Sequence, residues 1–411
     1  MSEAEQVRAE VRAWLAEHWD PDLPLLEWRE RLVASGWAAP SWPRRWFGRG
    51  LPEWAERVVG DELAAVDAVG RPPGIAPSLA AATILEHGPD HLRARFLRPL
   101  LTGGETWAQL FSEPGAGSDL AGLTTRAVLD GDRWVVNGQK VWSTSAHHAD
   151  LGLLLARTDW DAPKHRGITC FVLPMRQRGV EVRPLRQMNH HASFNEVFLA
   201  DAEVPADHVI GAAGEGWPVA LTTLAHERRF AARRVVLPTG GGRARDEARA
   251  EAAELLETYR WYPQRMGRPD LALDHARRLG RATDPVVRQE LARLHALRRV
   301  SEWTAARARA STARGRPGPE GSIAKLLLSH IARQAARTHT VICGPRGTLR
   351  GADGPYDGAI AEVFVSVPAQ SIAGGTDEIQ RNILAERVLG LPREPAPGRD
   401  VPFRRQIAPR G

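Results

Sequence analysis

The most informative segment of this chain is residues 110–120, LFSEPGAGSDL. An apolar run that includes Trp107, Leu110 and Phe111 ends here in a turn, where a proline and two glycines accompany serines and acidic residues. Glycine has no Cβ, so such a turn brings backbone N–H groups and a serine hydroxyl close to a ligand. The segment therefore indicates either a loop that binds a cofactor ring edge or a phosphate, or a plain surface turn.

Two later segments supply the context. Residues 135–145, VVNGQKVWSTS, predict a strand, a tight turn at Asn137-Gly138 and a second strand. Residues 372–387, IAGGTDEIQRNILAER, lie near the C-terminus. In this order and at this spacing, the three segments closely resemble the acyl-CoA dehydrogenase family of flavoenzymes. The resemblance extends from about residue 80 to residue 394.

The bulk properties are those of a soluble globular protein. A chain of 411 residues exceeds the usual size of one hydrophobic core, so we expect two or three structural units. The two cysteines, Cys170 and Cys343, are too few for a disulfide framework. The first residues, MSEAEQ, contain no basic region followed by an apolar core, and no run of about 18 apolar residues occurs. We therefore expect a cytoplasmic protein with no signal peptide and no membrane span.

The net charge of +6 is small for this length, and the arginines are interspersed with acidic residues. We find no zinc-finger spacing, RNA-binding signature or recognition-helix pattern, so we expect no nucleic-acid partner. A small positive net charge suits an anionic substrate such as a coenzyme A thioester. The adjacent histidines at 147–148 and 190–191 have no third ligand at a useful spacing, so we expect no metal site.

The hydrophobic pattern divides the chain into three parts. Val7, Val11 and Leu15 fall at helical spacing, whereas short apolar runs from about residue 106 predict strands. The predicted fold class is α+β and mainly α. It consists of an N-terminal helical domain, a middle β-barrel-like domain and a C-terminal four-helix bundle, as in the family. The predicted boundaries are 1–105, 106–213 and 214–394, followed by a mobile proline-rich tail at 395–411.

One segment departs from the family. Between Arg228 and Arg281 the chain is longer than a typical member and contains LPTGGG at residues 237–242. Three consecutive glycines break a helix, so we expect residues 237–264 to form an inserted loop or lid beside the active site. A surface excursion without a functional role is the alternative.

The resemblance implies an FAD cofactor between the β domain and the C-terminal bundle. It assigns Trp142 to packing on the flavin ring and Thr144 to a hydrogen bond with the polar edge of the ring. If Trp142 were a core residue and Thr144 an ordinary strand residue, these assignments would fail. Further contacts are implied along the glycine-rich segment, with Ser118 near the phosphates or coenzyme A: Gln109, Phe111, Ser112, Gly117 and Ser118.

The C-terminal part supplies the remaining cofactor contacts that the resemblance implies. Thr376 and Glu378 match positions that touch the nucleotide portion of FAD. Gly344 and Gly347 match a glycine-rich turn that approaches the cofactor across a dimer interface. Arg281 matches an arginine that reaches the pyrophosphate of the partner subunit. The chain departs from the family beside these positions, with Val341 in place of a glutamine and Asp284-Pro285 in place of Phe-Gly.

The implied reaction oxidises an acyl thioester by removing an α proton and transferring a β hydride to the flavin. The glutamate that commonly removes the proton is replaced here by Gly374. A second location known in the family corresponds to Glu227, directly before Arg228. We therefore predict Glu227 as the catalytic base, with Ser118, Arg228 and Gly374 contacting the substrate. Helix geometry alone leaves open a surface salt bridge for Glu227.

The missing side chain at Gly374 implies room for a branched or polycyclic acyl group. By resemblance, the reduced flavin passes its electrons to an electron-transfer flavoprotein, and the protein forms a homodimer or tetramer. Two alternatives have different chemistry. One is a non-catalytic partner subunit in a hetero-oligomeric acyl-CoA dehydrogenase, and the other is a flavin monooxygenase on the same fold.

Overall fold

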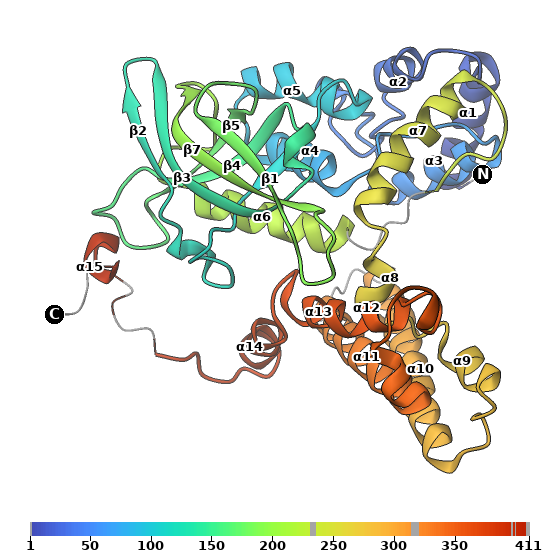
Figure 1. Cartoon of the computed structure of the whole chain (residues 1–411). Helices are drawn as coiled ribbons and strands as arrows, with labels where there is room; N and C mark the ends of the chain where they lie inside the picture. Colours follow the sequence, from blue (N-terminus) through green and yellow to red (C-terminus); the bar gives the residue numbers. More distant parts are fainter. Residues whose placement is uncertain (1, 231–235, 314–319, 396–397, 399, 408–411) are drawn as a thin grey trace. The chain divides into compact units, whose positions relative to one another are not determined.

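The computed structural model describes residues 2–230, 236–313, 320–395, 398 and 400–407, and the side chains of residues 75–77, 228–230, 312, 313 and 320 lie outside this description. The chain forms two compact units (Figure 1). The first unit contains residues 1–185, 193–258 and 397–411, and the second contains residues 186–192 and 259–396.

The N-terminal part of the first unit is helical, as predicted. Val7, Val11 and Leu15 are all buried on one face of the first helix, which confirms the helical spacing. Trp28 lies at the centre of this core, fully buried, and its indole Nε1 donates a hydrogen bond to the carbonyl oxygen of Val69 at 2.6 Å. The helices are α1 (Glu3–His18), α2 (Leu25–Ala34), α3 (Trp54–Ala65), α4 (Ile75–His87) and α5 (Asp90–Thr102).

The segment expected to be an inserted loop or lid instead forms a packed helix over most of its length. Helix α7 (Arg243–Thr258) packs against α2 and lies beside the N-terminal helices in Figure 1. Ala248 is buried in the same core as Trp28, and Arg29 on α2 donates two hydrogen bonds to Glu251. The prediction is wrong here because the three glycines precede the helix, while small buried alanines give α7 a face that fits α2.

The middle part of the first unit is a single sheet of eight strands in the order β6-β7-β3-β2-β4-β5-β8, with β1 paired in parallel to β4. Apolar side chains from both long and short strands fill its core. The sheet domain predicted from the apolar runs is confirmed. Its strands are β1 (Trp107–Leu110), β2 (Arg126–Asp130), β3 (Arg133–Thr144), β4 (Leu151–Arg157), β5 (Ile168–Pro174), β6 (Val180–Leu185), β7 (Phe194–Pro205) and β8 (Val209–Ile210).

The turn predicted at Asn137-Gly138 does not exist. Strand β3 runs through both residues, and the hairpin turn that joins it to β2 is at Gly131, which has φ +63°. Gly138 is required for a different reason: a Cβ there would come within 2.4 Å of Oγ1 of Thr125. Glycine therefore permits a close approach between neighbouring backbone segments at this position rather than a reversal of the chain.

Helix α6 (Gly216–Phe230) belongs to the first unit, because it packs against α4 and β5. Its buried face contains Val219, Ala220 and Thr223. The Thr223 Oγ1 lies 2.9 Å from Oγ1 of Thr83 on α4. The predicted boundary at residue 213 placed this helix with the C-terminal bundle, whereas its packing groups it with the sheet.

The C-terminal tail is partly packed rather than mobile. Helix α15 (Phe403–Ile407) lies against the loop that follows β4. Phe403 is 2% exposed, and the guanidinium carbon of the buried Arg157 lies 3.6 Å from the centre of its ring. The backbone N–H of Phe403 donates to the carbonyl oxygen of Ala162 at 3.0 Å. A cation–π contact in an enclosed position thus holds residues that composition alone suggested were free.

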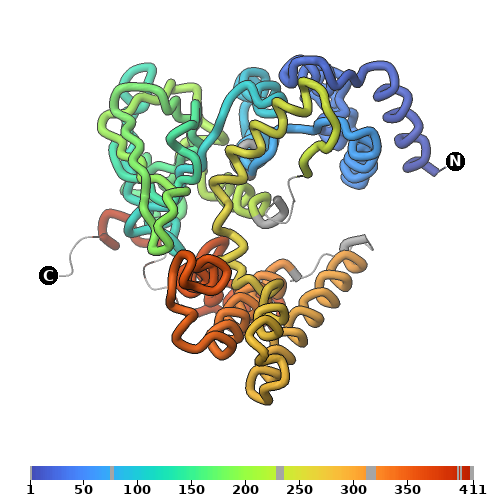
Figure 2. The backbone as a smooth tube through the Cα atoms, turned by 45° about the vertical axis from the view of Figure 1, so that its right-hand side comes forward, coloured from blue at the N-terminus to red at the C-terminus, as the bar shows by residue number. Residues whose placement is uncertain are grey.

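The second unit is helical, as predicted. Helices α10 and α11 lie side by side along its length (Figure 2). Leu294 on α10 and Ile331 and Ala335 on α11 are buried between them. None of the described helices of the chain has the length and apolar character needed to span a membrane. The helices of this unit are α8 (Tyr262–Arg265), α9 (Ala272–Arg278), α10 (Pro285–Ala313), α11 (Glu320–Cys343), α12 (Ala359–Ser366), α13 (Pro368–Ile372) and α14 (Asp377–Arg387).

Candidate cofactor site

The glycine-rich loop (residues 111–119) follows β1 in the first unit. Glu113 and Ala116 exchange two backbone hydrogen bonds of 3.0 Å, which close a tight turn. A Cβ added at Gly115 or Gly117 would meet nothing within 4 Å. The turn thus leaves its backbone accessible on one side, and Ser112 and Ser118 have side chains that are half-buried and exposed, respectively.

Strand β3 presents Trp142 to the outside. The pairing with β7 shifts register between Lys140 and Ser143, so the strand bulges at this point. Within the bulge Trp142 has φ +63°, a left-handed conformation that costs a non-glycine residue about 1 to 3 kcal/mol. The residue is 55% exposed, and its indole meets Phe194 edge to face at 5.6 Å. Trp142 is therefore not a core residue.

The other predicted contacts of the first unit lie on adjoining elements. Gln109 lies on β1, half-buried, opposite Leu153 of β4. Phe111 is buried at the start of the glycine-rich loop, and Thr144 is half-buried at the end of β3. Strand β1 and strand β3 are close neighbours in the fold. An exposed aromatic ring, an open backbone turn and accessible hydroxyls are the features that a planar cofactor with a phosphate tail requires, so these residues fit FAD.

A buried ion pair connects the loop to β3, and the sequence analysis missed it. The Nζ of Lys140 lies 2.8 Å from Oε1 of Glu113, and both residues are almost completely buried. Burial by itself raises the pKa of Glu113. The charge of Lys140, together with hydrogen bonds from Lys140, Thr125 and Thr124, outweighs burial and lowers the pKa to about 2. Glu113 is therefore ionised at neutral pH.

A signal for this pair exists in the sequence. Lys140 is one of only three lysines among 55 basic residues, and it lies within a segment predicted to be a strand. All three lysines pair with an acid of the recognised segments: Lys140 with Glu113, Lys164 with Asp119, and Lys325 with Asp377.

Glu227, the predicted base, lies on α6 and is half-buried. It follows Thr223 and Leu224 by one turn, and these two residues face α4 and the adjoining core. The neighbouring His226 pairs with Glu86 of α4 at 2.5 Å. The structure thus places Glu227 at the end of the buried face of α6, whereas the side chain of Arg228 lies outside the described residues.

The C-terminal motif lies in the second unit and contains Gly374 in a left-handed conformation, with φ +68°. A Cβ added at Gly374 would meet nothing within 4 Å. Thr376 caps α14, because its Oγ1 accepts a hydrogen bond from the N–H of Ile379 at 3.2 Å. Glu378 is exposed and pairs with Arg381 at 3.3 Å. The side chain of Thr376 is thus already hydrogen-bonded within the protein.

A buried carboxylate holds this motif in place. Asp377 accepts hydrogen bonds from Lys325 at 3.0 Å and from Arg333 at 2.8 Å, both on α11. Burial raises the pKa of Asp377, but the hydrogen bonds from Ser329, Arg333 and Lys325 outweigh this effect and keep the pKa far below its usual range. Asp377 therefore fixes the start of α14 against α11.

The structure brings Arg281 and the turn at Gly344–Gly347 together in the second unit. The Nη1 of Arg281 donates to the carbonyl oxygens of Val341 and Ile342 at 2.7 and 3.0 Å, and its Nη2 pairs with Asp284 at 2.7 Å. These bonds satisfy carbonyl groups at the end of α11. Gly344 has φ +56° and open space around it, so the turn presents bare backbone.

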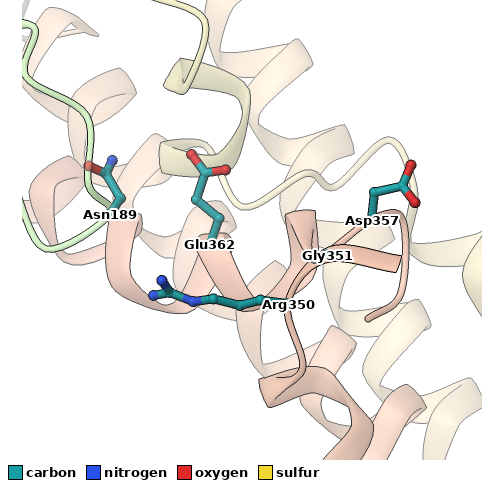
Figure 3. A pocket seen from close by; sticks show the side chains of 6 residues that line it. Asn189, Arg350, Gly351, Asp357 and Glu362 are labelled. Atoms are coloured by element: carbon teal, nitrogen blue, oxygen red, sulfur yellow. The ribbon is translucent and has the colours of Figure 1, made fainter. Parts of the chain in front are cut away.

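The second unit also contains a cavity of about 160 Å³ that the sequence analysis did not foresee (Figure 3). Glu362 on its wall accepts from His191 Nε2 at 2.9 Å, and Asn189 donates to Ser366 at 3.1 Å. None of the predicted site residues lines it. The lining residues are Asn189, Arg350, Gly351, Asp357, Gly358 and Glu362.

Models of three domains match this chain: the N-terminal domain of acyl-CoA dehydrogenases over residues 1–104, the middle domain over 108–202 and the C-terminal domain over 269–389. The chain belongs to the acyl-CoA dehydrogenase family. Family members are flavoprotein oxidoreductases of lipid metabolism and typically bind FAD. The interpretation of the three sequence segments is confirmed at the level of the family.

Relatives match this acyl-CoA dehydrogenase over nearly its whole length. Acyl-CoA dehydrogenase IpdE1 of Mycobacterium tuberculosis is 35% identical over 96% of this chain and 99% of its own. Acyl-CoA dehydrogenase FadE34 of the same organism is 38% identical, and the match covers 96% of this chain and 50% of FadE34.

Solved structures of the family have the same fold. The steroid acyl-CoA dehydrogenase Tcur3481-Tcur3483 is similar with a TM-score of 0.65 and 25% identity, over 95% of this chain and 98% of that one. The ChsE4-ChsE5 complex from Mycobacterium tuberculosis is similar with a TM-score of 0.62 and 26% identity, over 96% of this chain and 99% of that one.

Proposed function

We propose that this family member is an FAD-dependent dehydrogenase that converts an acyl-CoA thioester to its α,β-unsaturated form. The observation that carries the proposal is Trp142, an exposed indole held in a strained left-handed conformation beside the open glycine-rich loop. A protein keeps such strain where the side chain is needed at a particular place. When bound, the oxidised flavin supplies a two-electron acceptor for the β hydride.

Each unit contains residues that match FAD-contacting positions of the family. In the first unit we assign the ring contacts to Trp142, Thr144 and the segment from Gln109 to Ser112. Gly117 and Ser118 would approach the phosphates, because their backbone is open and a helix-free turn presents its N–H groups. In the second unit we propose Thr376 and Glu378 as contacts of the nucleotide portion. Arg281, Gly344 and Gly347 are proposed to contact the FAD of a partner subunit.

Glu227 is proposed as the base that removes the α proton. It is half-buried and follows Thr223, on the buried face of α6, by one turn. The position that commonly carries the base is Gly374, which has no ionisable group. Arg228 would contact the polar portion of the substrate, and Ser118 the coenzyme A end.

We propose a bulky, ring-containing acyl group as the substrate class. Gly374 is exposed, and a side chain there would meet nothing, so this part of the second unit leaves space that a glutamate would occupy. Similarity to a protein described as a steroid acyl-CoA dehydrogenase supports this class. The electrons would pass to an electron-transfer flavoprotein, and we propose a homodimer or tetramer in the cytoplasm.

One alternative has a specific observation in its favour. A solved relative is a complex of two different chains, ChsE4 and ChsE5, and Gly374 lacks the common base. This chain could then be the non-catalytic subunit of a hetero-oligomer. Expressed alone, a non-catalytic subunit would leave its flavin oxidised with every substrate, whereas the proposed enzyme reduces it.

The test is anaerobic reduction of the bound flavin. The purified protein is mixed with straight-chain, branched and steroid side-chain acyl-CoA thioesters, and loss of the flavin absorbance is recorded. We expect bleaching by at least one ring-containing substrate. Glu227→Gln is expected to bind FAD normally and to bleach at least a thousandfold more slowly. Wild-type bleaching rates in Glu227→Gln would refute the assignment of the base.

A further inference from the structure

The Glu113–Lys140 pair lies between the glycine-rich loop and the bulge that presents Trp142. Besides its bond to Glu113, the Nζ of Lys140 donates to the carbonyl oxygen of Phe111 at 3.1 Å. The next residue along β3, Val141, donates its N–H to the carbonyl oxygen of Ser112 at 2.9 Å. Three consecutive loop residues are therefore bonded to two consecutive residues of β3.

Glu113 connects this arrangement to the far end of the loop. Its Oε2 accepts from the N–H of Thr124 at 2.7 Å, and its Oε1 accepts from the N–H of Thr125 at 2.9 Å. The carboxylate of this loop residue thus binds the segment at Thr124 and Thr125 and the ammonium group of β3. Moving any of these three segments breaks hydrogen bonds in an enclosed, nearly water-free position.

The two charges form a unit because neither is stable alone. Lys140 has no exposed surface, and burial lowers its pKa, whereas the attraction of Glu113 opposes that effect. Removing one partner leaves the other charge buried without compensation, which is strongly unfavourable. A lysine suits this position, because its ammonium group donates to a carboxylate and a carbonyl at the same time and is more compact than the guanidinium of an arginine.

We propose that Glu113 and Lys140 are positioning residues that set the place of the glycine-rich loop relative to the Trp142 indole, and thereby determine the affinity for the flavin. This inference rests on the proposed function, because it assumes that the loop and Trp142 bind FAD. Neither Glu113 nor Lys140 is among the proposed cofactor contacts. They act on the cofactor through the backbone at Phe111 and Ser112 and through the bulge at Trp142.

The experiment compares Lys140→Met with the double variant Glu113→Gln/Lys140→Met. The control is Glu62→Gln, which removes the charge of an equally buried carboxylate that pairs with Arg8 and Arg12 of the N-terminal helices. Each full-length apoprotein is titrated with FAD to obtain Kd. Thermal unfolding of each apoprotein is recorded, and so is amide hydrogen exchange in peptides that cover residues 111–117 and 140–145.

We expect Lys140→Met to weaken FAD binding at least tenfold and to speed exchange in both peptides. Glu62→Gln should lower the unfolding temperature while the Kd for FAD changes less than threefold. The double variant has no uncompensated buried charge, so it should recover stability, but it should not recover FAD affinity because the bond to the Phe111 carbonyl is still missing.

Three results would overturn the inference. They are a wild-type Kd in folded Lys140→Met, a weakening in Glu62→Gln as large as in Lys140→Met, or recovery of both stability and affinity in the double variant. Failure of the proposed function looks different, because wild-type protein would then bind no FAD. In that case hydrogen exchange still tests whether the Glu113–Lys140 pair holds the loop and the bulge in place. Unchanged exchange in Lys140→Met would refute that structural role.

Discussion

Two buried histidines of the second unit should make its stability depend on pH. The Nδ1 atoms of His275 on α9 and His339 on α11 lie 3.2 Å apart, and Nε2 of His339 lies 3.0 Å from the carbonyl oxygen of Arg268. A carbonyl only accepts, so Nε2 of His339 carries the proton and its Nδ1 accepts from Nδ1–H of His275. Nε2 of His275 is then an unprotonated, buried atom without a hydrogen-bond partner in the described structure.

Protonation of His275 is therefore unfavourable in the folded protein. Burial lowers its pKa to about 4, with the neighbouring His339 contributing further, although Asp274 opposes the shift. The unfolded chain has the ordinary value of about 6.5 and binds the proton first as the pH falls. Stability from this group is thus complete above pH 6.5 and is lost as the pH falls from about 6.5 to 4. Between pH 7.5 and 4.5 the loss is on the order of 2 kcal/mol.

The assay is urea unfolding of wild type and His275→Asn at pH 7.5 and pH 4.5. The asparagine amide can still donate to His339 but does not titrate, so the loss of unfolding free energy on acidification should be smaller than in wild type by about 2 kcal/mol. His295→Asn removes an exposed histidine of α10 and serves as the control. Its unfolding free energy should decrease on acidification as much as that of wild type. An equal loss in wild type and His275→Asn would refute the assigned tautomers and the buried neutral state.

Two further stability predictions concern the first unit. Phe403→Ala should lower the free energy of unfolding by about 3 kcal/mol and expose the C-terminus to proteolysis, because the ring is enclosed beside a buried arginine. Ile407→Ala, at an exposed position of the same helix, should change stability by less than about 0.5 kcal/mol; equal effects would contradict the packing. Gly138→Ala should cost about 3 kcal/mol in urea unfolding through its clash with Thr125, whereas Gly131→Ala, which has open space and φ +63°, should cost about 1 kcal/mol. A larger loss of stability in Gly131→Ala than in Gly138→Ala would contradict the close approach of Gly138 to Thr125.

The elements that the sequence predicts correctly are those whose signal is local. The spacing of Val7, Val11 and Leu15 predicts the buried face of α1, and the fully buried strands β4 and β5 appear as uninterrupted apolar runs. Such patterns follow from the geometry of one helix or strand, so they need no knowledge of distant contacts. The three sequence segments likewise indicate the family, because they depend on order and spacing alone.

The predictions that fail concern contacts between distant parts of the chain. Asn137-Gly138 has the composition of a hairpin turn, yet Gly138 is explained by Thr125 on a neighbouring segment. The glycines before α7 suggest a loop, yet the helix is held by the backbone N–H of Leu25 and the side chain of Arg29, both on α2 and more than 200 residues earlier in the chain. The local sequence gives no information about these distant contacts. Tertiary packing therefore overrides the turn and loop preference of the glycines.

The amino-acid sequence by itself determined the family of this protein, the order of its helical and strand regions, and the absence of an ionisable group at position 374. Only the tertiary structure decided that Lys140 pairs with Glu113, that Trp142 is held outward in a left-handed conformation, and that Glu227 lies at the end of a buried face. The physical reason is that the state of a charged or strained residue depends on which atoms replace water around it. Those atoms come from segments that only folding brings together.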